Sequence, residues 1–253
     1  MKTFLKLWSG SLPVPAEFNV WNILVKDMKS FLTAVSILAI VTLISSCSKD
    51  DTPEPVKDID GNIYKTIRIG TQVWMAENLK TTRFNDGTEI REVVSKENWA
   101  NLSAEGYCWY DNDAETYKDT YGALYNGYTV SSGELCPAGW HIPLREDWQK
   151  LMEFLSDTIT GGNSLKIKGS QFWPSSDKST DNSTGFSALP SGIRYFEGTF
   201  SSINTFTSFW SGTETGKNDL WYISLYSGSS GVSMRHISKK YGFSVRCVKD
   251  EAN

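Results

Sequence analysis

Catalytic motifs are the first thing that this sequence lacks. The 253 residues include only two histidines, His141 and His236, so any Ser–His–Asp or Cys–His site would have to use one of them. There is no Gly-x-Ser-x-Gly elbow, no His-Glu-x-x-His zinc motif and no phosphate-binding loop. His141 stands between Trp140 and the start of an expected helix, and His236 shares an expected strand face with Met234. Packing accounts for both histidines, and the pattern argues against an enzyme.

Clustered positive charge is also missing. The chain has 25 Lys and Arg against 29 Asp and Glu, with no basic cluster. Residues 1–46 hold four lysines and two acidic residues, so their removal would change the formal net charge from −4 to −6. Because a nucleic-acid backbone demands positive charge, we expect no nucleic-acid partner. The absence of an internal repeat argues against a solenoid or a propeller.

No uncharged run is long enough to span a bilayer. The run from Phe31 to Ile44 has fourteen residues, whereas a transmembrane helix needs about 20. Met28 and Lys29 begin this run, which predicts a signal peptide over residues 28–46 rather than a membrane helix. Residues 1–27 carry acidic, Trp and Pro residues before that complete signal, so we interpret them as an over-extension of the start site.

The end of the signal resembles the lipobox of bacterial lipoproteins. It reads Ile44-Ser45-Ser46-Cys47, and the resemblance implies that Cys47 receives acyl chains such as palmitate and becomes the new amino terminus. Ser48-Lys49-Asp50-Asp51 then resembles the export tag of Bacteroidetes-type lipoproteins. We therefore expect a lipid-anchored protein at the cell surface of the outer membrane, with residues 47–57 as a Pro-containing tether.

From Val56 onward the pattern indicates short strands and tight turns. Asp60-Gly61 and Gly70-Thr71 mark two of the turns. The strand between them is expected to place on one face Ile63, Lys65, Ile67 and Ile69. The other expected elements are a helix over 95–104, a helix from Pro143 to Leu155 with apolar residues from Leu144 onward on one face, and strands over 220–225, 232–237 and 241–248. In the last strand, alternation predicts an inward face made by Tyr241, Phe243, Val245 and Cys247.

Several segments together resemble the Fibrobacter succinogenes major paralogous domain, which occurs in secreted and lipid-anchored bacterial proteins. The segments, in family order, are Ile69–Leu79, Tyr121–Asn126, Cys136–Pro143, Gly185–Pro190, Phe209–Ser211 and Gly242–Val248. They extend over about residues 58–250, nearly the whole chain after the tether.

The resemblance implies an α+β, C-type-lectin-like mixed domain related to the formylglycine-generating-enzyme group. Such a domain has short twisted antiparallel strands, one or two helices and long irregular loops. The molecular function of the family is not established, and a fold alone does not supply one. Nothing in the sequence reproduces the catalytic cysteine pair of the formylglycine-type enzymes.

Calcium is the one cofactor that the sequence leaves open. Asp111 and Asp113 alternate in the way that oxygen ligands of Ca²⁺ often do. Acidic residues at such positions are equally good turn formers. The sugar-binding lectin signatures Glu-Pro-Asn and Trp-Asn-Asp are absent, so we expect no cofactor and keep calcium as the alternative.

The segment from Gly169 to Asn218 is rich in Ser, Thr, Asn and Gly and contains nine aromatic residues. Long loops in compact domains are often functional, and exposed aromatic rings can stack on sugar rings. We take Trp173, Tyr195 and Phe196 as candidate ligand-binding residues. The leading hypothesis is a non-catalytic binding domain for a glycan or a protein. The alternative is a structural or adhesin-type display component without a small ligand.

Three cysteines remain once Cys47 is lipidated. Cys247 is expected to point inward and Cys136 precedes the main helix, so both belong near the core. We expect a disulfide between Cys136 and Cys247, with Cys108 free and buried beside Trp109. Three buried thiols acting as small hydrophobic side chains are the alternative.

Overall fold

The computed structural model of the chain describes residues 52–155, 160–169, 171–174 and 180–251. The extension over 1–27, the signal over 28–46, Cys47 and the export tag lie outside the described residues or at their boundary. The described part mixes short helices with open sheets, which matches the expected α+β class. More helices are present than the one or two expected: five α-helices and a 3-10 helix lie among the described residues.

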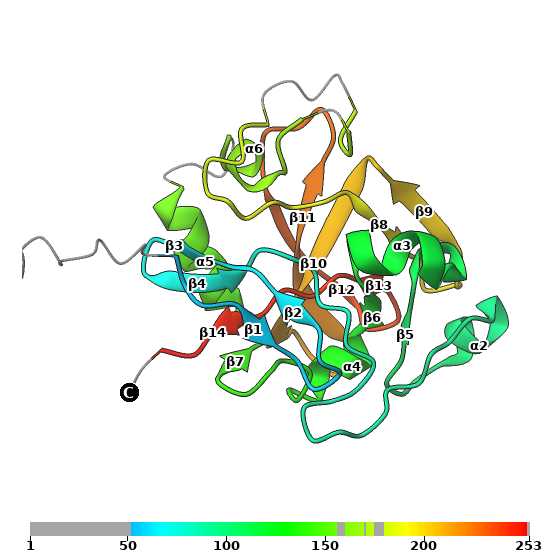
Figure 1. The fold of residues 1–253 in the computed structure, drawn as a ribbon. Coiled ribbons are helices and arrows are strands. Elements are labelled where there is room, and N and C mark those ends of the chain that lie inside the picture. Colours follow the sequence, from blue (N-terminus) through cyan, green and yellow to red (C-terminus); the bar gives the residue numbers. More distant parts are fainter. Residues whose placement is uncertain (1–51, 156–159, 170, 175–179, 252–253) are drawn as a thin grey trace, which may run out of the picture. The chain divides into compact units, whose positions relative to one another are not determined.

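Three sheets organise the strands (Figure 1). The first is a two-stranded antiparallel ribbon of β1 (Val56–Lys57) and β2 (Ile63–Tyr64). The second has the order β3-β4-β14-β7, built from Thr66–Ile69, Gln72–Met75, Val248–Lys249 and Trp140–His141.

The third sheet has the order β12-β11-β10-β8-β13-β6-β5, with β9 pairing only with β8. Its strands are Ser233–Ser238, Asp219–Tyr226, Phe206–Glu214, Ser191–Arg194, Gly242–Phe243, Leu124–Asn126 and Tyr107–Cys108, and β9 is Phe200–Ile203. The pairing of β10 with β8 is parallel, whereas the other pairs are antiparallel, so the sheet is mixed.

The main helix matches the periodicity of the sequence. α5 runs over Arg145–Phe154 and buries Trp148, Leu151 and Met152. Its first turn is capped by the carboxylate of Asp147, which accepts a hydrogen bond from the Leu144 amide at 2.8 Å. Leu144 itself was expected on the apolar face, but it caps the helix and its side chain is 45% exposed.

The other helices are short. α2 (Lys96–Asn101) lies within the range expected from the sequence and buries Trp99. The remaining helical elements are η1 (Tyr110–Asn112), α3 (Ala114–Tyr121), α4 (Gly127–Ser131) and α6 (Gly161–Leu165).

Two expectations about strands are corrected. Ile63 does not share an inward face with Ile69, because the expected single strand is interrupted and β2 and β3 belong to different sheets. Ile63 is 66% exposed, whereas Ile69 is buried. The stretch over 169–218 is not one long loop, since β8, β9 and β10 lie within it. The stretch is rich in small polar residues, a composition typical of loops, yet Thr207 and Ser208 of β10 are fully buried.

The closing segment differs from the expected single strand over 241–248. β13 ends at Phe243 and belongs to the eight-stranded sheet, and β14 begins at Val248 in the four-stranded sheet. Phe243, Val245 and Cys247 are buried as alternation predicts, but the intervening Ser244 and Arg246 are fully buried as well. The segment passes from one sheet to the other, so both of its faces are covered.

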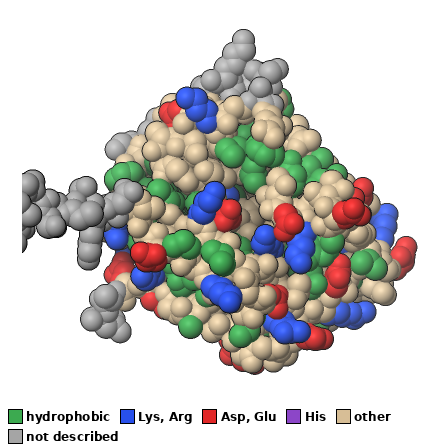
Figure 2. All heavy atoms as spheres, in the orientation of Figure 1, with side chains coloured by type: hydrophobic (Ala, Val, Ile, Leu, Met, Phe, Trp, Pro, Cys, Tyr) green, Lys and Arg blue, Asp and Glu red, His purple; other side chains and the backbone are tan. Residues whose placement is uncertain are grey.

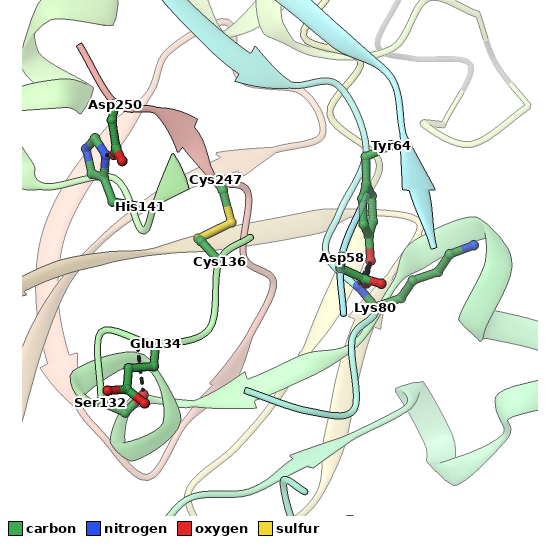
Figure 3. The surroundings of a disulfide bond; sticks show 9 residues. All are labelled: Asp58, Tyr64, Lys80, Ser132, Glu134, Cys136, His141, Cys247 and Asp250. Atoms are coloured by element: carbon green, nitrogen blue, oxygen red, sulfur yellow. Dashed lines mark hydrogen bonds and ion pairs between the residues drawn. A yellow bond between two sulfur atoms is a disulfide. The ribbon is translucent and has the colours of Figure 1, made fainter. Parts of the chain in front are cut away.

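The structure joins Cys136 and Cys247 in a disulfide, with a Cα–Cα distance of 6.0 Å (Figure 3). Cys108 is a buried free thiol. The bridge connects residues 111 positions apart. A cross-link across a loop of that length stabilises a fold by about 2–5 kcal/mol, largely by restricting the unfolded chain. Burial raises the pKa of the Cys108 thiol to about 12, so this thiol stays protonated at neutral pH.

Arg246 is the most constrained charged residue of the closing segment. Its Nε donates a hydrogen bond to the Asn78 side-chain oxygen at 2.8 Å, and its Nη atoms donate to the carbonyl oxygens of Phe186 and Ser187. The guanidinium lies 4.4 Å from the ring of Phe186 and 5.1 Å from that of Phe209. Burial lowers the pKa of Arg246 to about 9, which leaves it protonated at neutral pH.

Arg194 repeats this arrangement on β8. It is fully buried, and it donates hydrogen bonds to the backbone carbonyl oxygens of Val93, Val94, Ser95 and Gly198. Its guanidinium lies 4.4 Å from the Trp99 ring and 4.6 Å from the Phe200 ring. Among the described residues, neither buried guanidinium forms an ion pair with a carboxylate. Carbonyl dipoles and aromatic faces therefore compensate both charges, and the Glu77 carboxylate, without pairing with Arg246, also favours its charged form.

We expect Arg246→Lys to lower the free energy of unfolding by about 3 kcal/mol, because one ammonium cannot reach three separate acceptors and leaves buried oxygens unpaired. Arg68→Lys, at an exposed position, is the matched control and should change stability by less than about 0.5 kcal/mol. Urea unfolding of both variants measures the difference. Equal stabilities for the two variants would contradict the role given to Arg246.

Candidate aromatic ligand groove

The strongest candidate site is a groove beside the edge of the eight-stranded sheet. Alternation along β11 turns Tyr222 and Tyr226 to one face and Trp221 to the other. Tyr222 is the register partner of Trp210 on β10, and Tyr226 is the partner of Phe206. The rings of Phe206 and Tyr226 lie 4.7 Å apart. The sheet therefore supplies one aromatic wall.

The opposite wall comes from segments that follow other strands. Tyr195 follows β8, Tyr241 precedes β13, and their rings lie 5.9 Å apart. Phe243 connects the two walls, because its ring lies 5.8 Å from that of Tyr241 and 5.1 Å from that of Tyr222. Residues distant in sequence thus form the two walls of one aromatic groove.

The groove has a volume of about 390 Å³, which is within the usual range for small-ligand sites. Six of its eleven lining side chains are aromatic, four of them tyrosines, three are Ser or Thr, and two are isoleucines. The full lining is Ile193, Tyr195, Ser202, Thr205, Phe206, Tyr222, Tyr226, Ser227, Ile237, Tyr241 and Phe243. No lining side chain is charged, so the groove offers stacking surfaces and neutral hydrogen-bonding groups.

The hydroxyls of Tyr222 and Tyr241 are neutral at physiological pH. Burial raises the pKa of Tyr222 and that of Tyr241 above the usual value. Each phenol can therefore donate and accept hydrogen bonds.

At the rim, Ser202 and Asn204 have φ angles of 65°, a left-handed conformation that is uncommon for residues other than glycine. The β9–β10 turn holds this rim in place.

The three aromatic residues predicted from the sequence to bind a ligand lie in different surroundings. Tyr195 lines the groove, and Phe196 beside it is 50% exposed with its ring 5.7 Å from that of Tyr241. Trp173 is only 1% exposed and donates a hydrogen bond to the Ala188 carbonyl oxygen at 3.0 Å, so it offers no face to a ligand. The expectation that Trp173 binds a ligand is therefore wrong, because its ring packs in a buried hydrophobic cluster of the core.

Sequence reasoning missed the residues that complete the groove. Tyr222 and Tyr226 lie on β11 and Tyr241 precedes β13, so all three are outside the segment that had been considered for ligand binding. The signal that could have identified the first two was the spacing of four between tyrosines of one strand, which places both rings on one face. Nothing in the sequence placed Tyr195 opposite that face.

The two calcium candidates lie in η1 and at the start of α3. Asp113 caps α3 and accepts a hydrogen bond from the Thr116 amide at 3.0 Å. Asp111 lies in the preceding 3-10 turn with a φ angle of 53°. Within the described ranges, no group of three or more His, Cys, Asp and Glu side chains is placed to hold a metal ion.

The two histidines are both near carboxylates. His236 was expected to pack inward with Met234, but it is exposed and lies 3.6 Å from a carboxylate oxygen of Asp219 and beside the Trp221 ring. His236 is exposed because β12 lies at the edge of the eight-stranded sheet, where neither face of the strand is fully covered.

His141 lies between two carboxylates. Its Nδ1 lies 2.6 Å from Asp250 (Figure 3), and its Nε2 lies 3.1 Å from Asp147. Because both ring nitrogens face carboxylates, the imidazole serves here as a cross-link between α5 and the end of the chain after β14. A surface hollow of about 710 Å³ adjoins this cluster and is lined by charged residues of both signs, including Arg68, Glu146, Lys150 and Lys249.

The hydrogen bond to Asp147, opposed by burial and supported by a second bond to Asp250, raises the pKa of His141. A raised folded-state pKa gives stability that is complete below the unfolded value of about 6.5 and is lost as pH rises through the folded value. We expect thermal unfolding between pH 6 and 8 to show a decline that His141→Gln removes. Since the ring is partly exposed, the change should be within about 1 kcal/mol, or about 2–4 °C in Tm.

His236→Gln is the matched control for this measurement, because that imidazole is more exposed and has one carboxylate neighbour. It should keep the pH dependence of the wild type. A profile of His141→Gln identical to that of the wild type would contradict the cross-link.

Comparison with known proteins returned one family. The model described as the Fibrobacter succinogenes major domain matches residues 67–249, which include all the lining residues of the groove and both bridged cysteines. No curated protein and no solved structure matches the chain. The expected likeness to the C-type-lectin-like group therefore stays a prediction.

Proposed function

The chain belongs to the Fibrobacter succinogenes major domain family, and we propose that it is a surface-anchored lipoprotein whose folded domain binds a ligand in the aromatic groove without catalysing a reaction. The observation that carries this proposal is the lining of the groove. Six aromatic rings converge there from distant segments, and the lining has no charged side chain. Because the family has no established activity, the proposal rests on this site.

A role in binding rather than catalysis is supported by the chemistry of the groove. Its lining contains no carboxylate, imidazole or thiol, which are the groups that most often act as general acids, bases or nucleophiles. The more exposed aromatic rings beside it, Tyr226 at 42% and Phe196 at 50%, offer apolar faces to a ligand. The ligand is a glycan or a protein segment.

The anchor is supported by the sequence. The uncharged run from Phe31 to Ile44 leads directly to Cys47, and the tag over Ser48–Asp51 follows. Among the described residues, no helix has the length and hydropathy needed to cross a bilayer. On the face shown in Figure 2, Lys and Arg side chains are interspersed with Asp and Glu, an arrangement that does not favour a nucleic-acid partner.

The anchor is tested by Cys47→Ala. Mass spectrometry of the native protein should find an acylated Cys47 at the amino terminus, because the acyl chains supply the membrane affinity. The variant should accumulate as an unprocessed precursor or leave the membrane fraction.

Display at the cell surface is a separate test. Protease added to intact cells should remove the wild-type domain. A variant with Lys49, Asp50 and Asp51 changed to Ala is the control for display, since it should stay acylated but be protected. An unlipidated mature form that begins upstream of Met28 would contradict the anchor.

The binding role is tested on arrays of glycans and peptides with the full mature lipoprotein in detergent. Tyr226→Ala should weaken binding of its ligand at least tenfold, because an exposed stacking ring is lost. Trp221→Ala is the matched control, since it removes a half-buried aromatic ring from the opposite face of the same strand. If no bound species depends on Tyr226, and outer-membrane proteins are captured equally by both variants, the display role without a small ligand replaces this proposal.

A further inference from the structure

The chain that would link the proposed lipid anchor to the folded domain is short. The sequence predicts a tether over 47–57, but the chain is already fixed to the domain at Pro53 and Glu54. The hydroxyl of the buried Thr66 donates a hydrogen bond shared between the carbonyl oxygens of these two residues, at 2.9 Å from each. β1 begins at Val56 and pairs with β2. Only the residues between Cys47 and Pro53 therefore separate the anchor from the domain.

This short connection limits how the domain can be oriented on a membrane. An extended chain spans at most about 3.6 Å per residue, so six residue steps keep Pro53 within about 20 Å of the lipid headgroups. A compact domain of about 200 residues measures roughly 40 Å across. The attachment point can therefore be no higher above the bilayer than one radius of the domain. Whatever conformation the tether adopts, the half of the domain around Pro53 and Glu54 faces the lipids.

Two of the most exposed apolar side chains lie beside this attachment point. Ile63 on β2 is 66% exposed, the largest value among the large hydrophobic side chains of the described residues. It precedes Thr66 by three residues, about 10 Å along a strand. Phe154, at the end of α5, is 55% exposed, and its ring packs against Gly70 in the turn after β3 (Figure 1). Because Gly70 lies four residues beyond Thr66, the two apolar side chains flank the attachment point along the chain.

The ribbon of β1 and β2 turns Ile63 away from the core. Val56 and Tyr64 are register partners on its inner face and pack against the main hydrophobic cluster. Lys57 is the register partner of Ile63, so their side chains share the outer face. One exposed isoleucine is ordinary on a protein surface. Ile63 and Phe154 together, on the half that the tether turns toward the lipids, make a surface that a bilayer would cover.

The charged residues around this surface are of both signs. They include exposed or half-exposed side chains in equal number, namely Lys57, Lys65 and Arg68 against Glu54, Glu77 and Glu153. The surface therefore has no net charge that would draw it to anionic lipids. Any contact with a bilayer must come from its apolar side chains.

We propose that this anchor-proximal surface, made by Ile63 and Phe154, rests on the membrane that holds the lipid anchor; the proposal depends on the anchor proposed above. Both side chains enter the boundary between headgroups and acyl chains, where apolar side chains lose their contact with water. A second copy of the domain does not fit beneath this surface, because its width of roughly 40 Å exceeds the reach of the tether. The domain therefore lies against the bilayer, and its binding partner must come to the membrane surface.

The test uses the mature lipoprotein reconstituted in vesicles of neutral phosphatidylcholine. A fluorophore is attached to the thiol introduced by Ile63→Cys or by Phe154→Cys. Cys108 is buried and the other two cysteines of the domain are bridged, so the introduced thiol is the one that reacts. Phospholipids with a nitroxide on the upper acyl chain should lower the fluorescence of both labels to about half or less, because the labels reach the depth of the quencher. The quenching should be the same at low and high salt.

Val94→Cys is the matched control, because Val94 is as exposed as Phe154, at 55%. It precedes α2, which Figure 1 shows on the opposite side of the domain from β3 and α5. Its label should keep its fluorescence. If the labels at positions 63 and 154 are quenched no more than the label at 94, while the protein is acylated and floats with the vesicles, the proposed contact is overturned and the anchor stands. Quenching that vanishes as protein is added at constant lipid would show a second copy on this surface and would also overturn the contact. A protein without acyl chains that does not float would overturn both proposals.

Discussion

The Arg246 guanidinium lies where the closing segment passes between the two large sheets. Through its hydrogen bonds it joins Asn78 and the Phe186–Ser187 backbone to the segment between β13 and β14. Among the described residues no carboxylate forms an ion pair with it, so its charge is balanced by carbonyl dipoles, an amide oxygen and two aromatic rings, with a further electrostatic contribution from Glu77. Such compensation requires accurate geometry, because removing one acceptor would leave a buried charge underpaired. The loop and the strands around Arg246 must therefore be ordered together.

This constraint extends along the chain in both directions. Cys247, the next residue, is bridged to Cys136, and Ser244, two residues earlier, enters the buried hydroxyl network that reaches β8 and β10. Phe243 belongs to the groove. The disulfide restricts the unfolded chain, whereas the guanidinium and the hydroxyls select one packing arrangement in the folded state. The groove wall is therefore continuous with the most strongly fixed part of the molecule.

Local sequence patterns predicted α5, the β3–β4 turn and the inward face of Phe243, Val245 and Cys247, because each depends on the periodicity of a few neighbouring residues. They failed at Arg246 and at the stretch after Gly169. A charged residue in an alternating strand indicates solvent exposure, and runs of Ser and Thr indicate a loop. Here the partners that satisfy those groups come from distant segments, such as Asn78 for Arg246. No pattern within one segment contains that information, and the same holds for Tyr195 opposite Tyr222.

The groove is thus made of two kinds of parts. Tyr222 and Phe243 lie on strands fixed by register and by the neighbouring buried network, while Tyr195, Phe196 and the β9–β10 turn lie on short connections between strands. Side chains that are held in place before a ligand arrives lose less conformational freedom on binding. Connections between strands can change in sequence without disturbing the pairing beneath them. The groove therefore combines an aromatic floor fixed by the core with a wall carried on connections between strands, so changes in the wall need not disturb the floor.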